Sequence, residues 1–491
     1  MHENFLRAVV EILFENVVFA SNQTKVVLWQ PPQKLEQCFD FSLGQNGVTQ
    51  EKLLVFLKNT IKFSVKTGHR YFINQLFSGL DPYGLAGQWL TDALNASVYT
   101  YEVAPVFTLM ETHIIGEVCR MVGPQWGDGM FCPGGSTANG TAINLARFRY
   151  CPDIKKSGSC GLSRFVLFTS EECHYSIHKF ASFIGIGEDN VILISTDSIG
   201  QIVPEDLDEK IKKELAEGAI PLAVIATLGT TVRGAFDPIC EIAEICKKYN
   251  IWLHIDAAWG GGLIFSQKHR AKLNGIERAD SIVINPHKLL AVPQQCSILL
   301  VKNRDILYEC HSKHAEYLFQ KDKYYDKSYD LGDKYLQCGR KCDVFKFWFM
   351  WKAKGSSGFA NHIDTLMDLA EYFEGQIRER PEFMLVSPRQ YMNVCFWYLP
   401  RYLQGKQNIL DYSAQLHKVA PQIKAMMIKH GSVMMGYQPL KKLPNFFRFV
   451  SQNSSVTKKD VTYILDLISE IGTAIYKVGH VRGCKVKVWK V

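Results

Sequence analysis

The chain is 491 residues long, 47% hydrophobic and 21% charged, proportions that favour a folded globular protein over a disordered one. It is too long for one simple core, so two or three packed domains are expected. The net charge of +8 arises from 56 basic residues scattered among 48 acidic ones, with no long basic run, which gives nucleic-acid binding no support.

The sequence also gives little support for membrane insertion, disulfide bonding or metal binding. No uncharged apolar stretch is long enough to span a bilayer. Several of the fourteen cysteines stand singly in apolar segments, as reduced core cysteines do, and Cys338 and Cys342 have no second pair to complete a zinc site. We therefore expect a cytoplasmic protein with no metal, no membrane contact and no nucleic-acid partner.

Residues 1 to about 105 are predicted to form an N-terminal helical segment. The apolar run over 8–20 is interrupted by Glu11 and Glu15, which indicates an amphipathic helix rather than the core of a signal peptide. A second helix is predicted over 51–58. Helices ahead of an α/β core often cross to a second subunit, and packing within the chain is the simpler alternative.

Residues 106–355 alternate between apolar runs and helix-like stretches such as 204–211. Strands that are buried on both faces and linked by helices form a mostly parallel sheet, so this part is predicted to be a large α/β domain. The expected strands are 164–169, 191–195, 222–227, 251–255, 281–284 and 297–301.

Residues 356–491 follow a turn at 354–358 and are predicted to form a smaller α+β domain. An amphipathic helix comes first, with apolar residues recurring between Ile363 and Phe373. Alternating strands and a final helix, near Val461 to Val478, complete this domain.

Two of the predicted strands end on residues that carry chemistry. Segment 251–260 (IWLHIDAAWG) reaches Asp256, and segment 281–288 (SIVINPHK) reaches Lys288. A lysine at the end of a buried strand is costly to desolvate and usually serves a reaction. The pair suggests a pyridoxal-phosphate enzyme, in which Lys288 holds the cofactor as a Schiff base and Asp256 keeps the ring nitrogen protonated. Taken singly, Asp256 could instead cap a turn and Lys288 could be a surface lysine.

A glycine-rich turn at 131–140 (FCPGGSTANG) leads into a predicted helix over 142–147. The backbone amides around Gly135 and the hydroxyls of Ser136 and Thr137 would bind a phosphate at that helix start. A Gly-Gly turn that only caps a helix is the alternative.

Two further loops follow predicted strands. His174, in segment 169–178 (TSEECHYSIH), would stack on a flat heteroaromatic ring, or else cap the next helix. Thr230, in segment 227–237 (TLGTTVRGAFD), would close one side of the cofactor. Ligands of a parallel sheet bind at the carboxyl ends of its strands, so these loops together favour a single site.

Several motifs together resemble the group II pyridoxal-phosphate decarboxylases, in particular their glutamate and cysteine-sulfinate decarboxylase branch. They include NPHK at 285–288, DAAWGGG at 256–262, SEECHYS at 170–176 and GTT at 229–231. The resemblance covers nearly the whole chain beyond the first few dozen residues. It implies pyridoxal 5'-phosphate as the cofactor, the fold type I architecture of these enzymes, and a homodimer in which the N-terminal helical segment is exchanged between subunits.

The resemblance also implies roles for residues at the cofactor. Lys288, Asp256 and His174 keep the roles given above, while Ser136 with its neighbouring amides and His287 would serve the phosphate. The other cofactor positions are Gly135, Thr137, Thr230, Ala258 and Asn285.

For the substrate, Arg448 in NFFRFV at 445–450 matches the arginine that binds the α-carboxylate, and Gln75 would donate a hydrogen bond beside it. Tyr325 matches the loop tyrosine that protonates the carbon from which the carboxylate has left, and the adjacent Tyr324 blurs that choice. Together these matches imply the α-decarboxylation of a small acidic amino acid.

Two positions depart from the glutamate-preferring members of the branch. Phe77 stands where they carry a serine, and Ser136 where they carry an alanine. A phenyl ring would shorten the pocket, and a change of one methylene is worth about 1–3 kcal/mol of discrimination. Cysteine sulfinate and aspartate, giving hypotaurine and β-alanine, are therefore the expected substrates, with cysteate to taurine as a side activity and glutamate as a poor substrate. The alternatives are a glutamate decarboxylase, another reaction on the same fold, or a catalytically weak paralogue with a regulatory or binding role.

Overall fold

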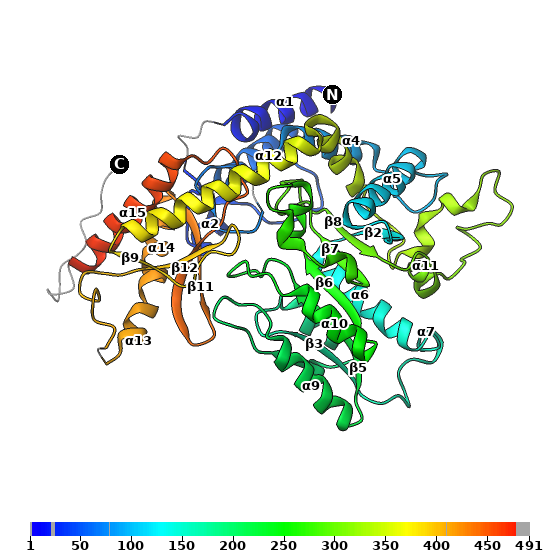
Figure 1. The fold of residues 1–491 in the computed structure, drawn as a ribbon. Helices are drawn as coiled ribbons and strands as arrows, with labels where there is room; N and C mark the ends of the chain where they lie inside the picture. Colours follow the sequence, from blue (N-terminus) through cyan, green and yellow to red (C-terminus); the bar gives the residue numbers. More distant parts are fainter. Residues whose placement is uncertain (1, 21–24, 78, 409, 478–491) are drawn as a thin grey trace. The chain divides into compact units, whose positions relative to one another are not determined.

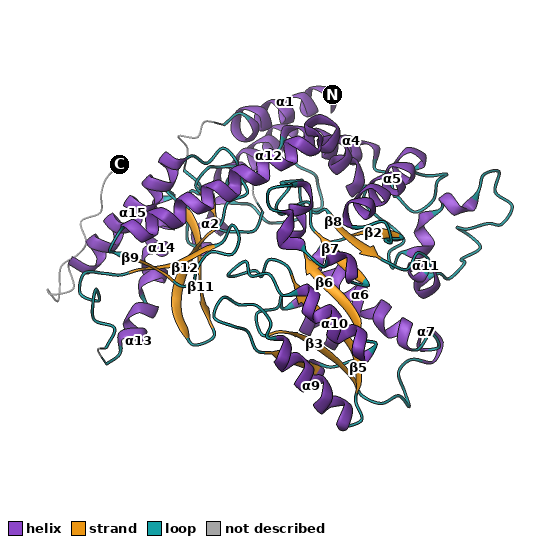
Figure 2. Ribbon diagram, in the orientation of Figure 1, coloured by secondary structure: helices purple, strands orange, loops and turns teal. Residues whose placement is uncertain are grey.

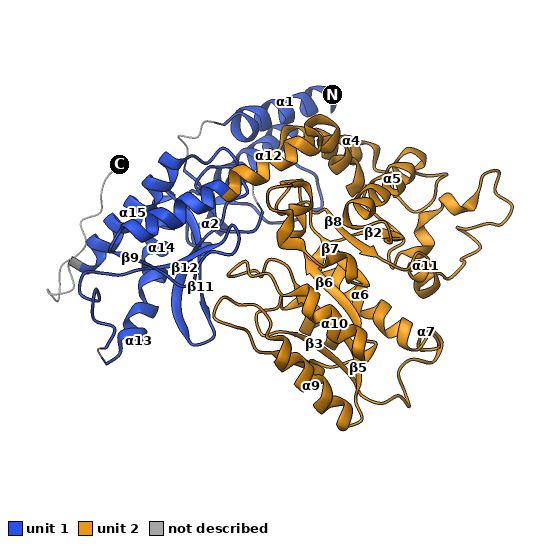
Figure 3. Ribbon diagram, viewed as in Figure 1, with its two compact units in different colours: residues 1–80, 368–491 blue, residues 81–367 orange. Residues whose placement is uncertain are grey.

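The computed structural model describes residues 2–20, 25–77, 79–408 and 410–477 (Figure 1). By their internal contacts the residues divide into two compact units, one of residues 1–80 with 368–491 and the other of residues 81–367 (Figure 3). The sequence instead suggests three parts, divided at about 105 and 355. That three-part division stays a prediction.

The unit of residues 81–367 is built on a seven-stranded sheet with the order β2-β8-β7-β6-β5-β3-β4. Neighbouring strands from β7 to β4 run parallel, whereas β8 is antiparallel to both β2 and β7. The predicted fold class, an α/β protein with a mostly parallel sheet, is confirmed. The strands are β2 (Asp128–Cys132), β3 (Phe165–Ser170), β4 (Val191–Ile194), β5 (Ile220–Thr227), β6 (Trp252–Ala257), β7 (Ser281–Ile284) and β8 (Ser297–Val301).

Helices cover both faces of this sheet (Figures 1 and 2). On one face α6 (Gly135–Tyr150) and α8 (Ser176–Phe183) pack their small and aliphatic residues against the strands in one buried cluster. On the other face lie α9 (Pro204–Ala216) and α10 (Ile239–Tyr249). Burial on both faces explains why the central strands are almost continuously apolar.

This unit has further helices before and after the sheet strands in the sequence. Helix α4 begins at Pro82, where the Asp81 carboxylate accepts hydrogen bonds from the amides of Tyr83 and Gly84, a regular N-cap. The other helices are α5 (Pro105–Val122), α7 (Ile154–Ser157) and α11 (Ile306–His311), with α4 ending at Leu94. Short 3₁₀ turns span Glu188–Asn190, Gly260–Phe265, Arg270–Leu273, Ile276–Arg278, Lys327–Tyr329 and Leu331–Lys334.

Helix α12 (Asp343–Glu379) runs through the division between the units and is broken at Gly355, whose φ of 66° is outside the helical range. A residue without a side chain accepts this backbone conformation at little cost, and the turn predicted at 354–358 is thus a kink inside a long helix. The amphipathic helix predicted between Ile363 and Phe373 forms its second half, and both of these side chains are buried.

The unit of residues 1–80 and 368–491 is built on a five-stranded sheet with the order β1-β11-β12-β10-β9. Its strands are antiparallel except for β1, which is parallel to β11. The strands are β1 (Phe72–Ile73), β9 (Phe383–Leu385), β10 (Val394–Tyr398), β11 (Met434–Leu440) and β12 (Leu443–Phe449). The helices are α1 (His2–Leu13) with a π-helical turn (Phe14–Val18), α2 (Pro32–Cys38), α3 (Gln50–Phe63), α13 (Tyr412–His417), α14 (Val419–His430) and α15 (Lys458–Lys477).

The strands predicted for the large sheet lie within two residues of their expected ends, whereas the helices predicted at 51–58 and 142–147 are longer than expected. Strands β1 and β2 were not predicted, and each has an identifiable cause. Strand β2 contains Gly129, where a Cβ atom would come within 2.6 Å of the Leu299 carbonyl oxygen. This close approach explains a residue that otherwise argues against a strand. Strand β1 is only two residues long. The final helix is confirmed as α15, while Val478, its predicted last residue, lies outside the described residues.

None of the helices within residues 2–20, 25–77, 79–408 and 410–477 combines the length and apolar character needed to cross a bilayer. In the same part of the chain, no cluster of three or more His, Cys, Asp or Glu side chains is suited to hold a metal ion.

A pair of helical glycines tests how tightly α6 packs. A Cβ atom at Gly140 would lie 2.0 Å from the Phe180 ring, whereas one at Gly116 on α5 would meet nothing within 4 Å. We expect Gly140→Ala to lower the free energy of unfolding by about 1–3 kcal/mol, because the ring of Phe180 must move. Gly116→Ala should raise it by about 0.4–1 kcal/mol, since alanine is the better helix former. Denaturant unfolding followed by circular dichroism measures both, and equal effects of the two substitutions would contradict the packing.

Candidate active site

A cavity of about 220 Å³ lies at the carboxyl ends of the parallel strands of the large sheet. It brings together most of the residues that the sequence assigns to the cofactor, including Lys288, Asp256 and His174. The lining residues are Gly134, Gly135, Ser136, Asn139, His174, Tyr175, Thr227, Gly229, Thr231, Asp256, Ala258, Trp259, Asn285, His287 and Lys288.

Asp256 stands near the end of β6, where its side chain is buried. Each carboxylate oxygen accepts a hydrogen bond: Oδ1 from the backbone amide of Ala258 at 3.0 Å, and Oδ2 from the side-chain amide of Asn139 at 2.8 Å. A carboxylate oxygen accepts more than one hydrogen bond, so Asp256 can also receive a proton donor from the cavity. The ring nitrogen of pyridoxal phosphate would be such a donor in its protonated form.

Lys288 follows β7 after a tight turn in which its backbone amide donates to the Asn285 carbonyl at 2.9 Å. Its side chain is half-buried and lines the same cavity as Asp256. Strands β6 and β7 are parallel neighbours, so their ends deliver the two residues to one edge of the sheet. This arrangement explains why a lysine and an acid far apart in sequence share one cavity.

His174 belongs to the loop between β3 and α8. Its Nδ1 accepts a hydrogen bond from the Ser176 backbone amide at 3.3 Å and lies 2.8 Å from the Ser176 hydroxyl. Burial lowers the pKa of His174, which keeps the imidazole neutral near pH 7. A neutral flat ring at the cavity wall is suited to stacking on another flat ring.

The start of α6 forms the polar end of the cavity. Gly134 precedes the helix with a φ of 94°, and no side chain caps the first amides. The 16-residue helix therefore directs its first N–H groups and the positive end of its dipole toward the cavity, an arrangement that suits a phosphate. A Cβ atom at Gly135 would lie 2.7 Å from Asn285 Nδ2, which explains the glycine.

Asn285 and His287 lie in this cavity too. Within the described part of the chain, Asn285 Oδ1 is buried without a hydrogen-bond partner, a polar atom left for a bound ligand. His287 Nδ1 lies 2.6 Å from the Cys296 carbonyl oxygen, and burial lowers the pKa of His287 to about 4. The amides, hydroxyls, acid and lysine of the cavity thus fit a phosphorylated pyridine aldehyde.

Two predicted cofactor residues, Thr137 and Thr230, are outside the set that lines the cavity. Thr230 Oγ1 accepts a hydrogen bond from the Ala235 amide at 3.0 Å and so shapes its own loop, while Thr231 reaches the cavity. Thr137 Oγ1 lies 3.4 Å from the Pro133 carbonyl. Contacts of these two threonines with the cofactor stay predictions.

The predicted substrate residues Arg448, Gln75 and Phe77 belong to the other compact unit. Arg448 on β12 is buried and donates from Nη2 to the Asn74 carbonyl at 3.0 Å, which places it beside the segment that carries Gln75. Gly436, its partner on β11, leaves room for the guanidinium. Phe77 is half-buried, with its ring 6.0 Å from that of Phe72. Their contacts with a substrate stay predictions.

Tyr325 is not among the cavity residues and is instead held by its own loop. Its hydroxyl donates to Asp330 Oδ1 at 2.9 Å and accepts from Lys323 Nζ at 3.0 Å and from the Glu102 amide at 3.3 Å. Burial is the main cause that raises the pKa of Tyr325. Tyr324 is 87% exposed, whereas the Tyr325 hydroxyl is hydrogen bonded within the loop. Which of the two tyrosines donates the proton stays a prediction.

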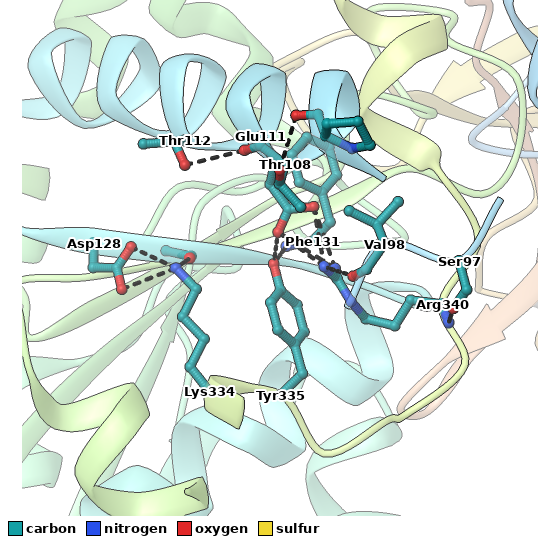
Figure 4. Close-up of polar contacts among 12 residues, drawn as sticks. Ser97, Val98, Thr108, Glu111, Thr112, Asp128, Phe131, Lys334, Tyr335 and Arg340 are labelled. Atoms are coloured by element: carbon teal, nitrogen blue, oxygen red, sulfur yellow. Dashed lines mark hydrogen bonds and ion pairs between the residues drawn. The ribbon is translucent and has the colours of Figure 1, made fainter. Parts of the chain in front are cut away.

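The end of this loop is anchored by a buried polar cluster (Figure 4). Glu111 on α5 accepts a hydrogen bond from the Tyr335 hydroxyl and pairs with Arg340, whose guanidinium lies 3.4 Å from the centre of the Tyr335 ring. Lys334 Nζ contacts both carboxylate oxygens of Asp128, at 2.8 and 3.0 Å. Burial raises the pKa of Glu111, while Arg340 opposes that shift. The cluster therefore fixes the chain that follows Tyr325 to α5 and β2.

The parallel sheet, the cavity at its carboxyl edge, and a lysine, an acid and a neutral imidazole around a helix start define a pyridoxal-phosphate enzyme. Comparison with known proteins agrees. The model of the pyridoxal-dependent decarboxylase conserved domain matches residues 32–399. The chain therefore belongs to the pyridoxal-dependent decarboxylase family and is a carboxy-lyase that uses pyridoxal phosphate.

Relatives place the chain in the branch expected from its motifs. The acidic amino acid decarboxylase GADL1 of Mus musculus is 48% identical over 96% of this chain and 86% of that protein. The cysteine sulfinic acid decarboxylase of Homo sapiens is 48% identical over 96% of both chains. A crystal structure of mouse CSAD superposes with a TM-score of 0.94 at 46% identity, covering 96% of this chain and 98% of the other. The resemblance to the acidic branch, and within it to the glutamate-decarboxylase-like acidic amino acid decarboxylase, is confirmed.

A buried acid lies behind the cavity wall and gives the fold a pH dependence. Asp237 accepts hydrogen bonds from the backbone amides of Thr227 and Ile202 at 2.7 and 2.9 Å. Burial, and to a lesser extent the charges of Glu172 and Asp197, raises its pKa to about 7. The folded protein therefore keeps a proton that the unfolded chain loses near pH 4.

Because the pKa is higher in the folded state, the stabilisation is complete at low pH and is lost as the pH rises through about 7. We expect the wild type to lose more stability than Asp237→Asn between about pH 5 and pH 8, since the amide cannot ionise. Urea unfolding at a series of pH values measures the difference. Parallel profiles of the two proteins would contradict the assignment.

Proposed function

We propose that this protein decarboxylates short acidic amino acids at the α-carbon, converting cysteine sulfinate to hypotaurine and aspartate to β-alanine. Cysteate to taurine would be a side activity, and glutamate a poor substrate. The observation that carries the proposal is the meeting of Lys288, Asp256 and His174 in one cavity of a pyridoxal-dependent decarboxylase. The names of the relatives, an acidic amino acid decarboxylase and a cysteine sulfinic acid decarboxylase, support the substrate class.

The residues of the cavity would have different roles in binding the cofactor. Bound pyridoxal phosphate supplies a ring that accepts the electron pair left by the departing carboxylate. Lys288 would hold the cofactor covalently, Asp256 would keep a proton on the ring nitrogen, and His174 would cover one ring face. The amides of Gly135 and Ser136, together with His287, would bind the phosphate end.

In the proposed reaction the substrate is held by its charges. Arg448 would pair with the α-carboxylate and Gln75 would donate a hydrogen bond beside it, because a guanidinium binds carboxylates in a fixed orientation. Phe77 would limit the length of the side chain that fits. Tyr325 would deliver the proton to the α-carbon after carbon dioxide leaves, a step that requires its loop to release the hydroxyl from Asp330.

We also propose that the protein acts as a cytoplasmic homodimer. Leu6 and Val10 of helix α1 are 61% and 38% exposed and Val17 of the following π-helical turn is 43% exposed, as expected if a second copy covers this face. The exchange of residues 1–105 between subunits belongs to this proposal. Light scattering at micromolar concentration would distinguish a dimer from a monomer.

Lys288→Ala should abolish covalent cofactor binding. We expect the wild type to carry a visible absorption band. Borohydride reduction should remove this band and leave the cofactor permanently attached to the protein, whereas Lys288→Ala should have no such reducible band. The matched control is Lys302→Ala, which removes a lysine that is outside the set lining the cavity and donates from Nζ to the Glu277 carbonyl at 3.1 Å. Mass spectrometry of the reduced protein checks the adduct, and an adduct that survives in Lys288→Ala would refute the role of this lysine.

A competition assay over aspartate, cysteine sulfinate, cysteate and glutamate tests the substrate choice. We expect amine products from the first two at the highest kcat/KM and little product from glutamate. If glutamate were the best substrate, the protein would be a glutamate decarboxylase. A protein that binds the cofactor yet forms no amine from any of the four would instead be the catalytically weak paralogue.

Replacement of Phe77 tests what shortens the pocket. We expect Phe77→Ser to raise kcat/KM for glutamate relative to aspartate by about 10- to 200-fold, the range that a methylene-sized change in a pocket produces. Phe77→Leu, which keeps an apolar side chain, should change the ratio far less. An unchanged ratio in Phe77→Ser would show that another residue sets the substrate length.

A further inference from the structure

Asn139 occupies a position in the site that sequence reasoning missed. It lies in α6, one turn after the phosphate-binding amides, and its side chain is 1% exposed. Its amide nitrogen donates to Asp256 Oδ2 at 2.8 Å and to Ser176 Oγ at 3.0 Å, and its amide oxygen lies 3.0 Å from His254 Nε2. All the hydrogen-bonding capacity of its nitrogen is thus used inside the protein.

The direction of each hydrogen bond follows from Asp256. A carboxylate only accepts hydrogen bonds, so the amide nitrogen of Asn139 must face Asp256 and the amide oxygen must face His254. His254 must then carry its proton on Nε2. Burial lowers the pKa of His254 to about 4, so the ring is neutral and its Nδ1 is an acceptor.

Ser281 and Trp252 extend this series of hydrogen bonds, each donating toward His254 and Asn139. The Ser281 hydroxyl lies 2.9 Å from His254 Nδ1 and donates to it, and the Trp252 indole donates to Ser281 Oγ at 2.8 Å. Trp252, His254 and Asp256 alternate along β6 and therefore share the face that α6 covers, while Ser281 is the partner of His254 on β7. One chain of buried donors thus runs from Trp252 to the Asp256 carboxylate.

A second branch leads from Asn139 to His174. Ser176 Oγ accepts from Asn139, which leaves its own proton for His174 Nδ1 at 2.8 Å. The Ser176 backbone amide also donates to this nitrogen, so His174 carries its proton on Nε2. The same side-chain amide therefore orients both the acid and the imidazole of the cavity.

We propose that Asn139 is a positioning residue for the cofactor, fixing Asp256 and His174 in one relative orientation, and that His254 with Ser281 and Trp252 in turn fixes Asn139. The inference rests on the roles proposed above for Asp256 and His174. It requires Asn139 to affect cofactor binding without touching the reacting atoms. His254, although a histidine beside the site, is not an acid or a base of the reaction, since it is neutral and enclosed.

The test uses the full-length protein stripped of pyridoxal phosphate and titrated back with it, followed by quenching of tryptophan fluorescence and by the visible absorption of the bound cofactor. Asn139→Ala should weaken cofactor binding about 10- to 100-fold, the effect typical of groups that orient a binding side chain. Asn139→Asp is isosteric but sets a second carboxylate against Asp256. Two adjacent carboxylates disfavour each other's ionisation. The cofactor affinity and the absorption of the bound cofactor in Asn139→Asp should therefore become strongly pH-dependent above neutrality.

The chain behind Asn139 predicts a graded series. His254→Phe leaves the Asn139 oxygen without its donor and should weaken cofactor binding less than Asn139→Ala, and Ser281→Ala less again. The matched control is Asn144 on the same helix, which hydrogen bonds to Arg147 and Cys310 and not to Asp256. Asn144→Ala and Asn144→Asp should leave cofactor affinity and its pH profile unchanged.

The outcomes separate this inference from the proposed function. Thermal unfolding of the stripped proteins identifies variants that fail to fold, and Asn139→Asp remains informative because it keeps the volume of the side chain. Wild-type affinity and a flat pH profile in Asn139→Asp, with weak binding in Asp256→Ala, would overturn the inference alone. Wild-type cofactor binding in Asp256→Ala would instead overturn the role of the acid on which the inference rests.

Discussion

A buried negative charge at the end of β6 is the constraint on which the site depends. Asp256 is buried, so its carboxyl oxygens depend on hydrogen bonds from the protein. Ala258 and Asn139 supply one donor to each oxygen, and both come from elements that the sheet itself positions. The rest of the cavity is arranged around a carboxylate that has two fixed bonds and an open side.

The parallel sheet explains how residues distant in sequence reach that carboxylate. Strands β3, β5, β6 and β7 run the same way, so their following loops meet at one edge and bring His174, Thr227, Asp256 and Lys288 together. Tyr325 is positioned differently, by side-chain hydrogen bonds within a loop and not by the end of a strand. The sheet thus positions the cavity residues, while the proposed proton donor is positioned by a loop.

Those parts of the fold and of the site could be predicted from sequence in which neighbouring residues alone determine the structure. Apolar runs predicted β3 to β8, and a lysine and an acid at strand ends predicted the cavity. Features that depend on a contact with a residue distant in the chain could not be predicted. Strand β2 was not predicted, and the Leu299 carbonyl that requires Gly129 in it is distant in the sequence. Asn139 was treated only as part of a glycine-rich turn, because its partner Asp256 lies 117 positions away. Even so, His254 stands two residues before Asp256, a spacing that puts both on one face of a strand.

Helix α6 contributes to both ends of the cavity. Its first amides form the polar end near Gly135, and Asn139, four residues later, holds the acid. Four residues of an α-helix advance about 6 Å, a length that rigid backbone hydrogen bonds keep constant. The distance between the proposed phosphate-binding end and the acid is therefore set by helical geometry rather than by flexible side chains. Selection for ligand length is thus built into the backbone, and a phosphorylated heterocycle of different reach would satisfy only one end.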